Sequence, residues 1–155
     1  MIAVLQRASE ASVSVAGKKI AAIGPGVLAL VCALPGDNQE STLALAGKIA
    51  NLRIFSDEKG QMNKSLLEVG GECLLVSQFT LAADVSRGRR PYFGVAAAPE
   101  QARQLCSDLA AELRRLKVPT REGEFAANMQ VALVNDGPVT LMLNTAAGNS
   151  AALVE

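Results

Sequence analysis

The chain has 155 residues, half of them hydrophobic, and its 15 basic and 15 acidic side chains leave it without net charge. This composition is typical of one folded domain and excludes a disordered chain. Zero net charge argues against general nucleic-acid coating, which needs excess positive charge, and leaves room only for a local basic patch. We expect no DNA partner. No apolar run reaches the roughly 18 residues of a membrane span. The first residues do not resemble a signal peptide, so we expect a cytoplasmic protein.

The sequence contains no histidine. This excludes a Ser-His-Asp triad, a Cys-His pair and histidine ligands for a metal. Cys32, Cys73 and Cys106 are widely spaced among apolar neighbours, which predicts reduced, buried thiols without metal-site spacing. We expect neither a metal nor a cofactor. An enzyme of this composition must use carboxylates, lysines, backbone groups or a group on its substrate.

The first part of the chain predicts strands. Apolar and alternating segments are separated by Gly, Pro and Lys turns, and the last segment is apolar throughout, as in a central strand buried on both faces. The predicted strands are residues 2–6, 11–15, 20–23 and 27–34.

A first helix follows these strands. Asp37 or Asn38 is suited to cap a helix that begins near Gln39. Apolar residues recur at helical spacing, so one face of this helix should pack on the sheet. The segment after it is ambiguous, and we read residues 62–65 as a loop that leads into a short extended piece.

The second half predicts a strand, a helix and a final pair of strands. Residues 72–81 begin as a buried strand and end with polar side chains, before a loop at 82–94. Pro99 suits the first turn of a second helix, whose apolar residues form one stripe. The remaining predictions are a loop at 120–124, strands at 129–134 and 139–143, and a flexible tail at 146–155.

Together these elements predict a single α+β domain over residues 1–145. Its sheet should be largely antiparallel and curled towards a barrel, with two main helices packed on it.

The segment Ser77-Gln78-Phe79-Thr80 places hydroxyls and an amide where a buried strand should be apolar. One interpretation is a strand that leaves the core with its polar atoms bonded to backbone. The other is a strand end that lines a pocket, where successive N–H groups face a developing oxyanion. Thr80 would need an activating base to act as a nucleophile, and no histidine exists to supply one.

Arg87, Arg89 and Arg90 lie in the loop after this strand. A basic loop can be ordinary solvated surface. It can also bind phosphate, and its nearness to the polar strand end makes an RNA or nucleotide backbone a reasonable ligand.

Residues 135–140, Asn-Asp-Gly-Pro-Val-Thr, lie between two apolar segments. Asp-Gly is a strong hairpin signal, so the plain interpretation is a turn between two paired strands. Gly137 permits torsions closed to other residues, and Pro138 fixes its own φ, so this backbone should be rigid.

The two polar segments, 77–81 and 135–140, resemble the signature motifs of the D-aminoacyl-tRNA deacylases. Further stretches agree over nearly the whole chain, to about Leu143; they are residues 6–7, 11–13, 53–57, 62–63, 125–127 and 129–131.

This resemblance implies a homodimer that hydrolyses the ester between a D-amino acid and the 3′ end of tRNA, with its active sites at the subunit interface. It implies a cis Gly137-Pro138 bond that reaches into the partner's site and leaves no room for an L side chain, whereas glycine would be accepted. Arg7 would brace this motif, Asn135 belongs to it, and Met129 would help hold the substrate end. Residues 77–80 would line the pocket for the ester.

Several alternatives stay open. Either Thr80 or the 2′-hydroxyl of the tRNA could be the activating group, and the absence of histidine favours the hydroxyl. A related deacylase with a trans Gly-Pro bond could instead remove a small L-amino acid. A dimeric module that binds a nucleotide or RNA end without catalysis is the main alternative from another class.

Overall fold

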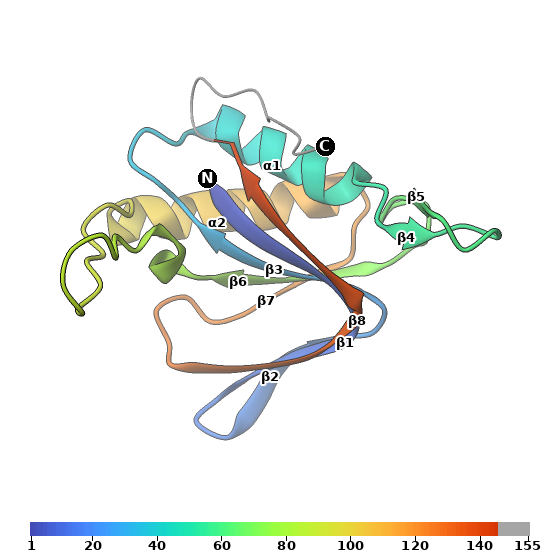
Figure 1. The fold of residues 1–155 in the computed structure, drawn as a ribbon, viewed down its shortest axis with the longest axis horizontal. Coiled ribbons are helices and arrows are strands. Elements are labelled where there is room, and N and C mark those ends of the chain that lie inside the picture. Colours follow the sequence, from blue (N-terminus) through green and yellow to red (C-terminus); the bar gives the residue numbers. More distant parts are fainter. Residues whose placement is uncertain (146–155) are drawn as a thin grey trace.

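Two long strands, β1 (Ile2–Val15) and β8 (Met129–Asn144), run antiparallel beside each other along nearly their whole lengths (Figure 1). The computed structural model describes residues 1–145. On its other side β1 pairs first with β3 (Gly26–Cys32) and then with β2 (Lys18–Ile23). The tail predicted at 146–155 lies outside the described residues.

Two shorter strands extend the sheet from β3. β6 (Glu72–Ser77) pairs with β3 in parallel, and β7 (Thr120–Glu122) pairs with β6 in parallel. The sheet therefore has six strands in the order β2-β1-β3-β6-β7, with β8 on β1. A separate two-stranded sheet consists of β4 (Phe55–Ser56) and β5 (Met62–Lys64).

Helices α1 (Gln39–Asn51) and α2 (Pro99–Arg115) lie on one side of the sheet (Figure 1). Asn38 caps α1, because its side chain accepts hydrogen bonds from the N–H groups of Glu40 and Ser41. Pro99 occupies the first turn of α2. The predicted fold class and both helices are thus confirmed, although the two parallel strand pairings were not foreseen.

β1 is one continuous strand, whereas the sequence predicted separate strands over residues 2–6 and 11–15. Ser9 and Glu10 are exposed where the partner of β1 changes from β3 to β2. These polar residues interrupt the apolar pattern but not the strand, because β8 continues to pair along the other edge.

Residues 135–140 do not form a hairpin turn, so this prediction was wrong. The segments on either side pair with β1 and not with each other: Thr140 lies opposite Gln6, and Asn135 lies opposite Ala8. The five-residue advance from Asn135 to Thr140 on β8 therefore lies opposite a two-residue advance from Gln6 to Ala8 on β1. The extra residues of β8 project from the hydrogen-bonded ladder as a bulge. Residues 135–140 are called the Gly-Pro bulge below.

The loop predicted at 120–124 was also wrong in part, because residues 120–122 form β7. The sequence signal was weak because three residues are too few to establish an alternation. Pairing with the edge of β6 decides the conformation instead, and the N–H of Gly123 still donates to the carbonyl of Leu75, 2.9 Å away.

Two hydrophobic clusters lie on opposite faces of β3 and β6. Leu5, Val27 and Leu75 belong to the cluster beneath the helices, with Leu45 of α1 and Leu109 of α2. Leu28, Leu74 and Val76 project from the other face into a second cluster with Val13 and Ile23. Because the far halves of β1 and β8 fold over this second cluster, the sheet curls towards a barrel (Figure 1).

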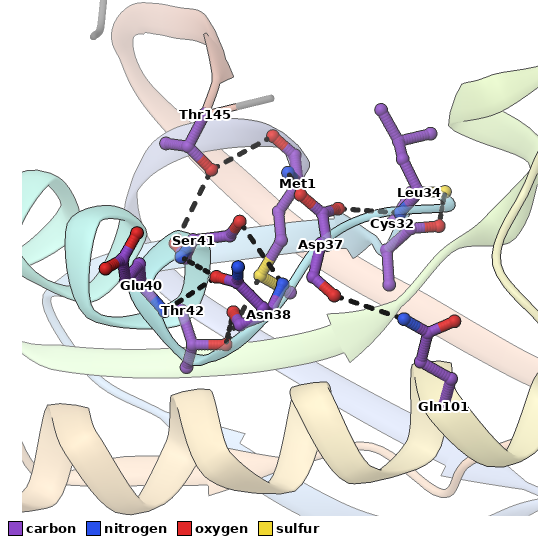
Figure 2. Close-up of polar contacts among 11 residues, drawn as sticks. Met1, Cys32, Leu34, Asp37, Asn38, Glu40, Ser41, Thr42, Gln101 and Thr145 are labelled. Atoms are coloured by element: carbon purple, nitrogen blue, oxygen red, sulfur yellow. Dashed lines mark hydrogen bonds and ion pairs between the residues drawn. The ribbon is translucent and has the colours of Figure 1, made fainter. Parts of the chain in front are cut away.

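The start of the chain is held inside the fold (Figure 2). The Met1 ammonium lies 2.6 Å from Asp37 Oδ1, and both side chains are almost fully buried. Asp37 Oδ2 accepts from the N–H of Leu34 at 2.7 Å, and the Asp37 carbonyl accepts from Gln101 on α2 at 3.1 Å. The Met1 carbonyl accepts from the N–H of Thr145 at 2.8 Å. This cluster therefore ties β1, α1, α2 and the end of β8 together.

The three cysteines are free and buried, as predicted. Among residues 1–145, no helix is long and apolar enough to cross a membrane.

Candidate active site

A pocket of about 690 Å³ opens where β3 and β6 end beside the start of α2. Its walls come from residues 31–33, 76–79, 93, 96–99, 125–129 and 131, together with Ala102 and Cys106 of α2. Val31 belongs to the helix-side cluster, whereas Val76 and Val131 belong to or pack on the second cluster. The pocket therefore lies at the end of the sheet where the two cores meet.

The strand end predicted to line a pocket does so. Ser77, Gln78 and Phe79 are among the lining residues, and the N–H of Gln78 donates to the Val31 carbonyl at 2.7 Å. The chain then turns into a short 3₁₀ helix (Phe79–Ala82). Thr80 is exposed within this turn and does not line the pocket. Met129 also lines the pocket.

The 3₁₀ turn begins at Phe79, a residue of the pocket wall. Its first internal hydrogen bond is donated by the N–H of Leu81 to the carbonyl of Gln78. The N–H groups of Phe79 and Thr80 precede that bond, so the turn supplies no carbonyl for them. Such adjacent donors can stabilise an oxyanion.

No residue that lines the pocket carries a charge. Its ionisable groups are the thiols of Cys32 and Cys106. Burial raises the pKa of the Cys106 thiol to about 11 and also raises the pKa of Cys32, so both are neutral near pH 7. The Thr80 hydroxyl accepts a hydrogen bond from Gln78 Nε2 at 2.5 Å, and no basic side chain contacts it within the described residues. The pocket can therefore supply shape, hydroxyl and amide groups and backbone donors, but no side-chain base.

The other predicted site residues lie at the Gly-Pro bulge. Arg7 is buried, and its Nε donates to the Asp136 carbonyl at 2.9 Å while Nη1 donates to the Ile54 carbonyl at 2.6 Å. Asn135 Oδ1 accepts from the N–H of Val139 at 3.0 Å, and its Nδ2 donates to Thr140 Oγ1 at 2.8 Å. The Gly137-Pro138 peptide bond is cis, and both residues are exposed. Arg7 and Asn135 thus hold an exposed Gly-Pro pair in place.

The pocket and the Gly-Pro bulge lie apart within one chain. Across the sheet, Arg7 of β1 pairs with Val27 of β3, and Val27 pairs with Cys73 near the start of β6. Ser77, at the pocket, lies at the other end of β6. None of Arg7, Asn135, Gly137 and Pro138 lines the pocket.

Sequence reasoning missed Phe93 and assigned no role to Phe125, although both line the pocket with Phe79. Phe93 and Phe79 meet edge to face with ring centroids 5.3 Å apart. No local pattern in the sequence marks them: the chain has only four phenylalanines, and the fold brings three of them together here.

The family model for D-Tyr-tRNA(Tyr) deacylase matches residues 4–144. The chain belongs to this deacylase family. A relative named D-aminoacyl-tRNA deacylase from Dinoroseobacter shibae is 57% identical over 143 residues, which cover 92% of this chain and 99% of that protein. A relative of the same name from Roseiflexus castenholzii is 56% identical over 94% of this chain and 93% of its own length.

Two solved structures place this deacylase family member among known folds. The c-Myc DNA Unwinding Element Binding Protein is 40% identical, has a TM-score of 0.89, and is matched over 95% of this chain and all of its own. A probable eukaryotic D-amino acid tRNA deacylase is 18% identical with a TM-score of 0.79, over 91% of this chain and 97% of its own, and shows likeness of fold alone.

Proposed function

We propose that this chain is a hydrolase that cleaves D-aminoacyl-tRNA to the free D-amino acid and tRNA in the cytoplasm, and so proofreads translation. The full-length match to relatives named for this activity carries the proposal. In the reaction, water adds to the ester carbonyl, the bond to the ribose oxygen breaks, and that oxygen takes up a proton.

The uncharged pocket supports a mechanism that depends on backbone and substrate groups. The terminal adenosine and the ester would lie among Ser77, Gln78 and Phe79, with Met129 opposite. The N–H groups of Phe79 and Thr80 would stabilise the oxyanion, and the 2′-hydroxyl of the terminal ribose would orient the attacking water. An aminoacyl ester is already reactive, so positioning can supply most of the required acceleration.

The Gly-Pro bulge would act in the pocket of a partner subunit. Its exposure and its distance from the chain's own pocket support this arrangement, as does the position of β8, which pairs only with β1 among the strands of residues 1–145. Main-chain atoms at Gly137 and Pro138 would exclude an L side chain by direct clash, while a D side chain points away. Glycine has no side chain to exclude, so glycyl-tRNA would also be cleaved.

The direct test compares hydrolysis of D-Tyr-tRNA and L-Tyr-tRNA by the purified protein. We expect rapid release of D-tyrosine and very slow release of L-tyrosine. Equal rates, or no hydrolysis of either substrate, would refute the proposed activity.

A variant of the bulge tests the selector separately. Gly137 has φ +136°, and an added Cβ would lie 2.9 Å from the backbone N of Val139. Gly137→Ala should therefore displace the bulge and reduce the ratio of D to L rates, whereas Gly36→Ala, at another left-handed glycine with open space around it, should leave the ratio unchanged. An unaltered ratio in folded Gly137→Ala would refute selection by the bulge.

A further inference from the structure

Four arginines beside the pocket have no acidic partner within residues 1–145. Arg87, Arg89 and Arg90 are exposed and make no hydrogen bond or ion pair in the described part of the chain. Arg103, on α2, stacks its guanidinium 4.5 Å from the centre of the Phe125 ring. By contrast Arg7, Arg114 and Arg115 each face a carboxylate at 3.2 Å or less. The unpaired guanidinium groups therefore keep donors available for an anion.

The first three arginines lie on a closed loop. Asp84 and Tyr92 exchange backbone hydrogen bonds of 2.8 and 2.9 Å, and the Asp84 carboxylate accepts from the N–H of Ser86 at 2.9 Å. Residues 84–92 are called the arginine loop below. The loop projects from the end of the molecule at which α2 begins (Figure 1).

This loop is attached directly to the pocket. The 3₁₀ turn with Phe79 precedes it and Phe93 follows it, and these two rings contact each other in the pocket wall. The guanidinium of Arg103 stacks on the ring of Phe125, which lines another part of the pocket wall. Positive charge therefore flanks the pocket from two elements, although the whole chain carries no net charge.

We propose that the arginine loop and Arg103 bind the phosphates of the single-stranded 3′ end of tRNA, upstream of the nucleotide held in the pocket. This inference rests on the proposed function. Guanidinium groups bind phosphate in a bidentate manner, and an arginine stacked on an aromatic ring keeps its N–H edge free for this contact. Phosphate contacts fix the position of a strand without reading its sequence, so this surface would let one pocket accept many tRNAs.

The experiment compares two substrates. One is D-Tyr-tRNA, and the other is the D-tyrosyl ester of adenosine, which has the reacting groups but no upstream phosphate. In the variant Arg87→Gln/Arg89→Gln/Arg90→Gln, kcat/KM for D-Tyr-tRNA should fall at least about tenfold through KM, while hydrolysis of the adenosine ester should stay within about twofold. The plot of log kcat/KM against log salt concentration should also become shallower. Each lost phosphate contact to a single strand changes its slope by roughly 0.7, so the loss of three arginines should change it by about 2.

A matched control removes the same charge elsewhere. Lys18, Lys19 and Lys59 are exposed and lack ion pairs within residues 1–145. Lys18→Gln/Lys19→Gln/Lys59→Gln should leave both substrates and the salt slope unchanged. For Arg103, replacement by Gln should weaken tRNA binding more than replacement by Lys, which keeps the charge.

The outcomes separate the two proposals. If the wild type cleaves both esters but the arginine variant matches the lysine control on tRNA, phosphate binding by the arginine loop is refuted while the activity stands. Equal losses on tRNA and on the adenosine ester would mean that the loop only shapes the pocket, which also refutes the inference. If single-stranded DNA of the same sequence competes as well as RNA, contacts to phosphate alone are supported. If the wild type cleaves neither ester, the proposed function itself fails.

Discussion

Thr80 is the side chain near the site that most resembles a nucleophile, yet its surroundings do not activate it. Its oxygen accepts a hydrogen bond from Gln78, and no carboxylate, lysine or histidine contacts it within residues 1–145. The absence of histidine from the sequence excluded the usual activating base, whereas a carboxylate or a lysine stayed possible for Thr80. Residue chemistry thus limited the mechanism before the geometry was known.

We expect Thr80→Ala to retain activity within about tenfold of the wild type, because its hydroxyl takes no proton in the proposed mechanism. A substrate that ends in 2′-deoxyadenosine should instead react about 10²-fold more slowly or worse, the usual range for a lost proton-transfer or orienting group. Single-turnover rates on both substrates give the comparison. An inactive, folded Thr80→Ala with the ribose substrate would restore Thr80 as nucleophile.

Among the elements, those with strong local signals were predictable. The apolar run at β3, the Asn38 cap of α1 and Pro99 in α2 each specify a local conformation whatever the rest of the chain does. β7 and the course of β8 were not predictable, because long-range pairing decides them. An Asp-Gly pair favours a hairpin only when the flanking strands pair with each other, and here both pair with β1.

The pocket was predictable only in part for the same reason. Ser77 and Gln78 could be recognised from the sequence because they are polar residues in an apolar strand. The walls from residues 93, 96–99, 125–129 and 131 carry no such local signal, because tertiary folding alone brings them beside β6.

The parallel contact between β3 and β6 leaves no space at Gly26. An added Cβ would lie 1.9 Å from the carbonyl oxygen of Glu72, which is backbone and cannot move aside easily. Gly26→Ala should therefore destabilise the fold by about 3 kcal/mol or more, in the range of severe core substitutions.

Gly47→Ala is the matched control, because this α1 position has open space around it. Here alanine should stabilise by about 0.5–1 kcal/mol through helix propensity. Urea unfolding of both variants measures the difference. Equal stability of Gly26→Ala and the wild type would show that β3 and β6 can separate at this point without cost.

At the scale of the whole molecule, the pocket and the Gly-Pro bulge lie apart, because none of Asn135, Gly137 and Pro138 lines the pocket of the same chain. Exposed apolar side chains on β8, Val134 at 52% and Met142 at 75% exposure, flank the Gly-Pro bulge. A second copy of the chain could cover these side chains and bring each bulge to the other's pocket.

If the protein forms the homodimer proposed above, Val134→Asp/Met142→Asp should dissociate it and abolish deacylation together. Light scattering after size exclusion gives the mass, and D-Tyr-tRNA hydrolysis gives the activity. Ile20 is an exposed apolar residue on β2, and Ile20→Asp should change neither the mass nor the activity. A monomeric wild type that is fully active at the same concentration would contradict the shared site.

The buried Met1 ammonium has a practical consequence for how the protein is produced. Met1 is 0% exposed and its nitrogen pairs with Asp37, so a formyl group or tag residues on that nitrogen would remove the charge and need space that the fold does not offer. An unpaired buried Asp37 carboxylate would cost about 3–5 kcal/mol. A protein tagged before Met1 should melt several degrees below one tagged after Glu155, and removal of the tag to restore a free Met1 should recover the difference. Equal melting temperatures would show that the ion pair is dispensable. The placement of a purification tag can thus determine how stable the isolated enzyme is.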